Sequence, residues 1–274
     1  MTDEARKALG PILRVAGLSA SIDGQQVVEQ VDFEVPATGV TAVLGRNGVG
    51  KTSTLKAVLG LISRSGVVEF DGERIDSEPT HRIVQRGIGY VPEDREVFAS
   101  LTVAENLRLA ERGTTPHRDM VDELFPDLIA RSAQRAGSLS GGQQQMLSLA
   151  RVLMNDNRLL MVDEPTKGLA PRIVTEVAAA LERAAAVTPV LLVEQNLPVV
   201  RRLAHTVVVI EGGRVIHAGP AAELLDDDER TQQLLGVHST DHGAPKGDTD
   251  HGAPRGDTEH GASKGADESR EETP

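Results

Sequence analysis

The sequence has no cysteine and no tryptophan, and its aromatic residues are limited to four phenylalanines and one tyrosine. The absence of cysteine excludes disulfide scaffolds, cysteine-ligated zinc sites and thiol nucleophiles. The scarcity of aromatic rings argues against a surface on which nucleic-acid bases stack. No stretch approaches the roughly 18 apolar residues of a membrane-spanning helix, and residues 1–10 lack the apolar core of a signal peptide. We therefore expect a cytoplasmic chain, which can still dock onto a membrane protein.

Acidic residues outnumber basic ones in this chain of 274 residues, with 41 Asp and Glu against 29 Lys and Arg and a formal net charge of -12. This balance argues against nucleic-acid coating or a basic membrane-binding patch as the main function. Hydrophobic residues make up 39% of the chain and charged residues 26%, which is typical of a globular protein with a substantial core.

The composition changes at residue 237, after which the chain has no Leu, Ile or aromatic residue. This last segment repeats with a nine-residue period, as DHGAPKGDT at 241–249, DHGAPRGDT at 250–258 and EHGASKGAD at 259–267. Such a segment cannot bury enough apolar surface to offset its chain entropy, so we predict a disordered acidic tail over 237–274. Its repeated histidines are not expected to bind metal, because unstructured repeats do not hold three ligands in place: His242, His251 and His260.

Short apolar runs rich in Val, Ile and Leu alternate with stretches of helical period between residues 11 and 236. Three of these runs predict buried strands, at 39–45, 158–164 and 188–195. The alternation favours a mostly parallel sheet flanked by helices. We therefore predict a flexible N-terminus over 1–10 and an α/β domain over 11–236.

Two additions to this parallel sheet are predicted. The runs ILRVAGLSASI and QQVVEQVDFEV, joined through Asp23 and Gly24, indicate an N-terminal antiparallel β subdomain. The segment from about 101 to 136 is predicted to be helical, and the distance between the first two buried strands is too long for one crossover helix. An inserted helical subdomain at about 93–150 accounts for that length.

The run GRNGVGKT at residues 45–52 follows the first buried strand and precedes a helical run. Glycines at this spacing let backbone N–H groups converge on phosphate oxygens, and the helix N-terminus adds partial positive charge. Lys51 is expected to reach the outer phosphates of ATP, and Thr52 is expected to ligate Mg²⁺. The alternative is a glycine-rich turn that only caps a helix. The predicted nucleotide-binding residues here are Gly45, Asn47, Gly48, Gly50, Lys51, Thr52 and Ser53. The predicted class is a phosphate-loop NTPase.

Two carboxylates end the second buried strand. Asp163 is predicted to hold Mg²⁺, and Glu164 is predicted to be the catalytic residue that polarises the attacking water. Apolar runs often end in acidic residues, so ordinary strand termination is the alternative. The phosphate loop in the same chain favours the catalytic interpretation.

A second glycine-containing segment predicts another helix N-terminus suited to an anion. Ser140 is a good N-cap, Gly141 and Gly142 expose backbone N–H groups, and Gln143 follows them. Because one phosphate loop already serves one triphosphate, we expect this second segment to bind the nucleotide of a neighbouring subunit. The alternative is a plain capped helix.

The three motifs LSGGQ at 139–143, GRNGVGKT at 45–52 and LLMVDEP at 159–165 together resemble an ATP-binding subunit of an ABC transporter, over about residues 11–236. The resemblance implies ATP and Mg²⁺ as cofactors and a head-to-tail pair of subunits, each a copy or a paralogue of the other. It also implies transmembrane permease subunits as partners, indirectly a solute-binding protein, and a place on the inner face of the cell membrane. No nucleic-acid partner is expected.

Further segments narrow the resemblance. YVPE at 90–93, GLAP at 168–171 and VEQN at 193–196, with SLTVAENL at 100–107, are similar to the import ATPases for branched-chain amino acids. ATPases for urea and other amino-acid-like solutes remain open.

Three positions depart from the pattern of the wider family. Glu93 stands where glutamine is usual, and is predicted to hold Mg²⁺ or the attacking water, although its charge repels phosphate more than an amide does. Gln195 replaces the usual switch histidine, so it can donate a hydrogen bond to the γ-phosphate but cannot carry a proton. Ile22 stands where an adenine-stacking aromatic residue is usual, which is expected to weaken contact with the base.

A competing class is a soluble ABC ATPase that acts on nucleic acid or the ribosome. Such proteins usually carry tandem ATPase domains, a long coiled coil or a basic accessory domain, and this sequence has none of these. A small-molecule kinase is a further alternative, but the segment at 139–143 would have no task there.

Overall fold

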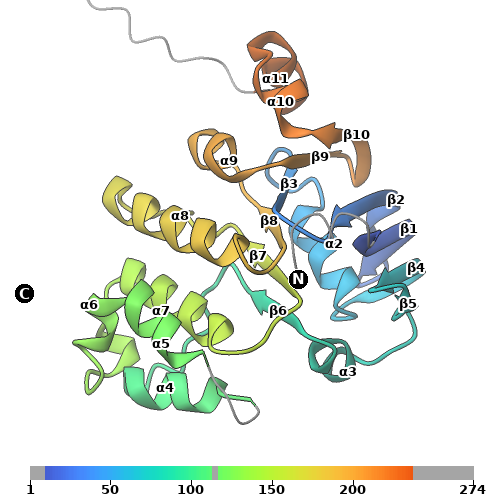
Figure 1. The fold of residues 1–274 in the computed structure, drawn as a ribbon. Helices are drawn as coiled ribbons and strands as arrows, with labels where there is room; N and C mark the ends of the chain where they lie inside the picture. The colour runs from blue at the N-terminus through green and yellow to red at the C-terminus, as the bar shows by residue number, and fades with distance from the viewer. Residues whose placement is uncertain (1–9, 113–116, 237–274) are drawn as a thin grey trace, which may run out of the picture. The chain divides into compact units, whose positions relative to one another are not determined.

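The computed structural model describes residues 10–112 and 117–236 (Figure 1). The predicted tail, with its repeats and its three histidines, lies outside the described residues, as do residues 1–9. In the described ranges, no helix combines the length and the apolar character that a membrane crossing requires.

A six-stranded sheet forms the centre of the fold. Its strands, in order across the sheet, are β10 (Arg214–Pro220), β9 (Thr206–Glu211), β3 (Val40–Leu44), β8 (Val190–Val193), β7 (Leu159–Asp163) and β6 (Ile88–Val91). All neighbouring strands pair in parallel except β10, which is antiparallel to β9. The carboxyl ends of the five parallel strands therefore meet at one edge of the sheet. The strands predicted at 39–45, 158–164 and 188–195 are confirmed as β3, β7 and β8.

A second, antiparallel sheet has the order β2-β1-β4-β5. Its strands are β1 (Pro11–Ile22), β2 (Gln25–Pro36), β4 (Ser63–Phe70) and β5 (Glu73–Arg74). The predicted pair β1 and β2 is confirmed, and its turn at Asp23 and Gly24 has the positive φ angles of 51° and 81° that a tight hairpin needs. The sequence did not predict β4, because that strand is polar and glycine-containing in its first half and lies largely at the surface.

The helices that follow the chain are α2 (Lys51–Val58), α3 (Thr80–Gln85), α4 (Val103–Ala110), α5 (Arg118–Leu124), α6 (Pro126–Ile129), α7 (Gly141–Leu153), α8 (Pro171–Ala185), α9 (Leu197–Leu203), α10 (Ala221–Leu225) and α11 (Asp228–Leu235). The segment from about 101 to 136, which was predicted to be helical, contains the short helices α4, α5 and α6 in its described part. Helix α5 ends at Leu124. The next residue, Phe125, has a φ of -130° and a ψ of 55°, which are not helical, because Pro126 disfavours a helical conformation in the residue before it. The boundaries of a helical subdomain at 93–150 stay a prediction.

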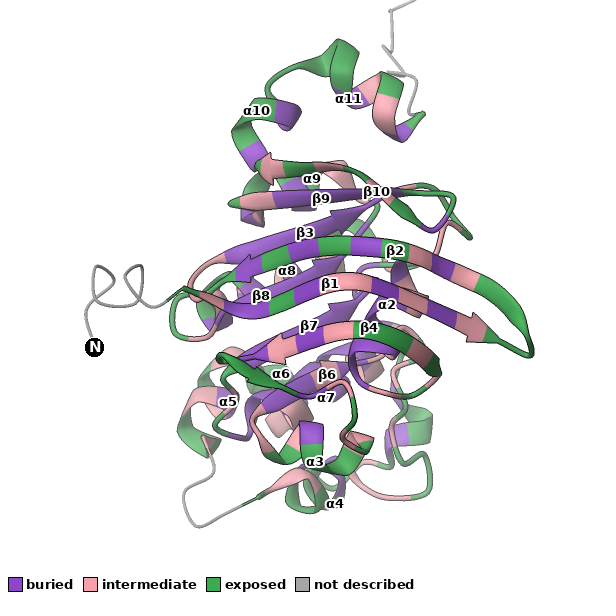
Figure 2. Cartoon of the chain, turned by 90° about the vertical axis from the view of Figure 1, so that its right-hand side faces the viewer, coloured by how far each residue is buried: buried purple, intermediate pink, exposed green. Residues whose placement is uncertain are grey.

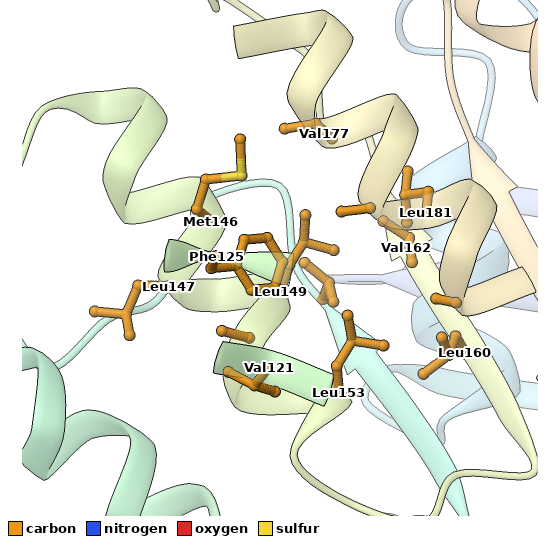
Figure 3. Close-up of a cluster of buried hydrophobic side chains, with 14 of the residues drawn as sticks. Val121, Phe125, Met146, Leu147, Leu149, Leu153, Leu160, Val162, Val177 and Leu181 are labelled. Carbon is orange, nitrogen blue, oxygen red and sulfur yellow. The ribbon is translucent and has the colours of Figure 1, made fainter. Parts of the chain in front are cut away.

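Both faces of the sheet are buried along the central strands β3, β8 and β7 (Figure 2), whereas the edge strand β10 is partly exposed. Leu159 and Met161 of β7 pack with the antiparallel sheet and α2, whereas Leu160 and Val162 pack with α7 and α8. This alternation follows from the two-residue period of a strand. Figure 3 shows the second of these clusters, in which Leu149 of α7 and its neighbours face the sheet. The sheet therefore lies between two layers (Figure 1), one formed by α7 and α8 and the other by the antiparallel sheet and α2.

Arg64 of β4 fixes the C-terminal end of α2. Its guanidinium donates to the carbonyl oxygens of Ala57 at 2.6 Å and Val58 at 2.5 Å, which are among the last carbonyls of the helix. It also donates to the carbonyl oxygens of Ile75 at 2.8 Å and Asp76 at 3.2 Å. Carbonyls at a helix C-terminus lack intrahelical partners, and a cation there is favoured by the helix dipole. The helix after the phosphate-loop sequence is therefore anchored at its far end.

We expect Arg64→Met to destabilise the chain by about 2–4 kcal/mol, because it removes the charge-assisted hydrogen bonds to four backbone carbonyl oxygens. Urea unfolding would measure this loss. The matched control is Arg14→Met, since Arg14 is half-exposed and pairs with Glu34 and Glu69 at the surface. Its expected effect is within about 0.5 kcal/mol. Equal losses in both variants would contradict the anchoring role.

Candidate functional site

The loop between β3 and α2 is pressed against the backbone of two other strands. Gly45 has a φ of 146°, and a Cβ atom there would lie 2.2 Å from the carbonyl oxygen of Ile210 in β9. Gly50 has a φ of 104°, and its Cβ atom would lie 2.5 Å from the carbonyl oxygen of Val27 in β2. Both φ angles are in the region that glycine favours. Packing and backbone conformation therefore each require glycine at these two positions.

Backbone hydrogen bonds tie the same loop to the turn between β9 and β10. The Gly213 amide donates to the carbonyl oxygen of Val49 at 2.9 Å, and the Glu29 amide donates to that of Gly213 at 2.8 Å. Helix α2 begins at Lys51, so its first N–H groups have no acceptor within the helix. A fixed loop followed by a helix N-terminus is an arrangement that binds phosphate.

A cavity of about 470 Å³ lies over this loop. Its walls come from the loop and the start of α2, from β2, from the β9–β10 turn, and from two segments that follow β6 and β7. The lining residues are 25–29, 47–53, Glu93, Glu164, Lys167, Gly212 and Gly213.

Lys51 is the buried cation of the site, with 4% of its side chain exposed. Its Nζ donates to the carbonyl oxygens of Gly45 at 3.0 Å and Arg46 at 2.9 Å, and lies 3.6 Å from Oε1 of Glu164. Burial lowers the pKa of Lys51, and the neighbouring Glu164 carboxylate opposes that shift. The ammonium group of Lys51 is thus surrounded by two carbonyl oxygens of the loop and one carboxylate oxygen of Glu164.

Asp163 lies at the end of β7 and is completely buried. Its Oδ1 accepts a hydrogen bond from Thr52 Oγ1 at 3.0 Å, and its Oδ2 accepts one from the Tyr90 hydroxyl at 3.4 Å. Burial raises the pKa of Asp163 to about 6, although the hydrogen bond from Thr52 opposes the rise.

This pair of oxygen ligands fits Mg²⁺. A hydroxyl and a carboxylate side by side are hard oxygen donors, which Mg²⁺ prefers. Among the described residues, no group of three His, Asp or Glu side chains could hold a metal alone. Mg²⁺ commonly takes only one or two protein ligands and completes its shell with water and substrate phosphates.

Glu164 follows β7 directly and is held in a left-handed conformation, with a φ of 42° that is uncommon for a residue other than glycine. Only 7% of its side chain is exposed. Its Oε2 lies 3.3 Å from Nζ of Lys167, while its Oε1 faces Lys51 and accepts a hydrogen bond from the Gln195 amide. Backbone strain of this kind is tolerated where the surroundings fix a residue, and it is concentrated at functional sites.

Gln195 links this carboxylate to the phosphate-loop segment. Its Nε2 donates to Oδ1 of Asn47 at 2.5 Å and also to Glu164. Two of the three residues predicted as catalytic, Glu164 and Gln195, are therefore in direct contact, and the third is Glu93.

Glu194, which the sequence analysis did not select, holds Gln195 in place. Its buried carboxylate accepts hydrogen bonds from the backbone amides of Gln195 at 2.6 Å and Asn196 at 2.8 Å. The other oxygen accepts from the amide of Thr166 at 3.2 Å and from the Thr166 hydroxyl. This carboxylate thus joins the segment after β8 to the segment after β7. An acidic residue at the end of an apolar strand was the only signal for it in the sequence.

Glu93 reaches the cavity from the segment after β6. Its carboxylate accepts a hydrogen bond from Nζ of Lys167, so Lys167 stands between Glu93 and Glu164. Lys167 comes directly before the GLAP segment, and the sequence did not predict that it lies in the pocket.

The structure brings most of the predicted nucleotide-binding residues together. Those that line the cavity are Asn47, Gly48, Gly50, Lys51, Thr52, Ser53, Glu93 and Glu164. Asp163 and Gln195 reach the same place through hydrogen bonds to Thr52 and Glu164. Tyr90, which was not predicted as a site residue, contacts Asp163.

The segment at 139–143 does not line this cavity. Ser140 caps α7, accepting a hydrogen bond from the Gln143 amide at 3.3 Å, and the Gln143 side chain accepts one from the Ser140 amide at 2.9 Å. The predicted N-cap is therefore confirmed. A Cβ atom at Gly142 would lie 2.8 Å from Ile173 of α8, so packing also requires glycine there. These residues and Gly141 lie outside the phosphate-loop pocket of their own chain, and their binding of a neighbour's nucleotide stays a prediction.

Comparisons with known proteins agree with this geometry. The family described as ABC transporter matches residues 28–167. The chain is 38% identical to the high-affinity branched-chain amino acid transport ATP-binding protein BraG of Pseudomonas aeruginosa, over 77% of this chain and 94% of that protein. It is 30% identical to the lipopolysaccharide export system ATP-binding protein LptB of Haemophilus influenzae, over 82% and 97% of the two chains.

A solved structure described as the ATP binding subunit of an ABC transporter has the same fold. It superposes with a TM-score of 0.70 at 26% identity, over 82% of this chain and 95% of that one. The predicted α/β phosphate-loop NTPase fold is confirmed.

We expect Asp163→Asn to stabilise the nucleotide-free chain at pH 8. The pKa of Asp163 in the folded state, about 6, lies above the ordinary value of 3.8. The carboxyl group therefore favours the folded state at low pH, and this contribution is lost as the pH rises through about 6. The amide keeps partners in Thr52 and Tyr90 while removing the buried charge. The expected gain at pH 8 is roughly 3 kcal/mol, falling toward zero near pH 4.

Urea unfolding at the two pH values measures this gain. Asp71→Asn is the control, since Asp71 is half-exposed and paired with Arg158 at the surface. It should change the free energy of unfolding by no more than about 0.5 kcal/mol at either pH. A gain for Asp163→Asn that is absent at pH 8, or equally large at pH 4, would exclude the buried charge as its cause.

Proposed function

The chain belongs to the ABC transporter family as an ATP-hydrolysing, ATP-binding subunit, and from this premise we propose that it powers an importer of branched-chain amino acids. The observation that carries the ATP-hydrolysing part of this proposal is that Lys51, Asp163 and Glu164 lie close together at the glycine-bounded loop. A buried cation, a carboxylate paired with a hydroxyl, and a second carboxylate are the groups that phosphoryl transfer to water needs.

The phosphate loop and Lys51 would bind the triphosphate of ATP. In the structure the Lys51 ammonium is satisfied by two loop carbonyls and Glu164. The outer phosphates of ATP offer it a stronger, doubly charged partner. The free N–H groups at the start of α2 supply further donors, with Ser53 in the same turn.

Thr52 and Asp163 would hold Mg²⁺, which when bound neutralises charge on the phosphates. Asp163 must be ionised for this, which its pKa of about 6 allows at neutral pH. Glu93 is proposed as a further oxygen ligand for Mg²⁺ or for the attacking water, and its carboxylate also accepts a hydrogen bond from Lys167.

Glu164 is proposed as the catalytic residue that orients and polarises the attacking water. Its left-handed backbone conformation and its low exposure suit a carboxylate that must keep one orientation toward the attacking water. Gln195 already contacts Glu164 and Asn47, so its amide can align the carboxylate with the phosphate loop. As an amide it donates a hydrogen bond but transfers no proton, which leaves proton abstraction to Glu164.

A second subunit completes the site in this proposal. Ser140, Gly141, Gly142 and Gln143 form a capped helix N-terminus that its own pocket does not use. Such a terminus suits an anion, and the γ-phosphate held by a facing subunit is one. The facing subunit is a second copy of this chain or a paralogue, and closure of the pair on ATP would move the permease subunits.

The transported solute is proposed from two observations. The YVPE, GLAP and VEQN segments are similar to those of branched-chain amino acid import ATPases. The relative BraG carries the name of that transport activity and is more similar to the chain than the lipopolysaccharide-exporting relative is. The proposal places the chain on the inner face of the cell membrane, bound to permease subunits that receive solute from a solute-binding protein.

Glu164→Gln tests this proposal. The variant should bind Mg²⁺ and ATP within about threefold of the parent, because the amide keeps the shape of the side chain, while hydrolysis should fall at least about 100-fold. When the chain is expressed with its permease subunits in cells that lack their own transporters, uptake of radiolabelled leucine should fall in parallel. Glu34→Gln, on the exposed face of β2, is the control.

Two results would count against the proposal. Unchanged ATP turnover in Glu164→Gln would show that Glu164 is not the catalytic residue. The proposal that the solute is a branched-chain amino acid would be rejected if the parent chain hydrolyses ATP and associates with its permeases but supports no leucine uptake.

A further inference from the structure

Lys167 is a second lysine in the pocket, and the proposed mechanism gives it no task. It lies in the segment between β7 and α8, and its side chain lines the cavity over the phosphate loop. Its Nζ donates a hydrogen bond to the Glu93 carboxylate and lies 3.3 Å from Oε2 of Glu164. It therefore bridges two carboxylates that reach the cavity from different strands.

The charge balance of the cavity makes this bridge important. The described residues that line it include three acids, Glu29, Glu93 and Glu164, and two cations, Lys51 and Lys167. A triphosphate brings several more negative charges into the same space. Lys51 is occupied by two loop carbonyls and Glu164.

Glu93 lines the cavity from the segment after β6, so its carboxylate faces the space that a triphosphate would occupy. Lys167 is the cation that contacts Glu93. The hydrogen bonds that Lys167 donates to Glu93 and then to Glu164 raise the pKa of Lys167, so the side chain stays an ammonium ion throughout the neutral range.

The contact between Lys167 and Glu93 contributes little to folding. The Lys167 side chain is 54% exposed and that of Glu93 is 33% exposed, and ion pairs with this exposure are worth little in stability. The segment around Lys167 has other supports. The Lys167 amide donates to the carbonyl oxygen of Glu164 at 3.2 Å, and Thr166 is held by Glu194. The ammonium group is thus not needed to shape the loop.

We propose that Lys167 is a positioning residue that neutralises Glu93, so that a pocket with a glutamate at this place still accepts the triphosphate of ATP. This inference rests on the proposed function of the pocket as the ATP site. It makes Lys167 and Glu93 an interdependent pair, although they are far apart in the sequence and belong to different segments.

A double-mutant cycle with steady-state ATPase kinetics tests the pair. Lys167→Met should raise KM for MgATP about tenfold at low ionic strength, with a smaller change in kcat, because an uncompensated carboxylate then faces the triphosphate. The same substitution in a Glu93→Gln background should raise KM no more than about twofold. Any loss that comes from the Glu164 contact appears in both backgrounds and cancels in the comparison.

Three further measurements separate charge compensation from a structural role. Lys167→Arg keeps the charge and should restore KM to within about threefold of the parent. The KM effect of Lys167→Met should shrink as salt is added, because charges in an open pocket are screened. The midpoint of thermal unfolding should not change. Arg202→Met, which removes a charge from the exposed pair with Glu182, is the control for net charge.

The inference is overturned if Lys167→Met has the same effect on KM with and without Glu93→Gln, or if it has none. These results leave the proposed function intact, provided that the parent hydrolyses ATP and Glu164→Gln does not. If the parent neither binds nor hydrolyses ATP, the proposed function fails, and the inference fails with it.

Discussion

The site depends on one packing constraint, the close approach of three backbones around the phosphate loop. The loop passes so near the carbonyl oxygens of Ile210 and Val27 that neither Gly45 nor Gly50 has room for a side chain. That contact fixes the loop against β9 and β2, and α2 starts directly behind it. The carboxyl ends of the parallel strands meet at the same edge, so the residues after β6, β7 and β8 reach the loop from fixed positions.

Electrostatics follows from that geometry. The carboxylate of Asp163 and the ammonium of Lys51 are buried. Burial raises the pKa of Asp163 and lowers the pKa of Lys51, so in each case it favours the neutral form. The left-handed backbone of Glu164 adds strain. Buried charges and backbone strain of this kind lower the stability of the fold, and a ligand that interacts favourably with these groups raises it. The free energy regained in this way therefore contributes to the affinity for a magnesium–triphosphate complex.

The sequence predicted the parts of this site whose signal is local. Apolar runs marked β3, β7 and β8, and the spacing of glycines with Lys51 marked the loop. It missed what depends on contacts between distant segments, such as the bridge from Lys167 to Glu93 and the buried acceptor Glu194. Strand β4 has no alternating apolar pattern, because it lies largely at the surface. The segment from about 101 to 136 was predicted to be helical, but the division between α5 and α6 was not predicted; it lies at Phe125, where Pro126 disfavours a helical conformation.

The central claim is that the backbone amides of the phosphate loop bind the phosphates of ATP. Hydrogen–deuterium exchange of the full chain, with and without saturating Mg²⁺ and ATP, tests it most directly because it reads those amides themselves. The account predicts slower exchange in peptides that cover residues 45–53, together with the segment at 163–167. Unchanged exchange across 45–53 at saturating ATP, or protection confined to other segments, would contradict it.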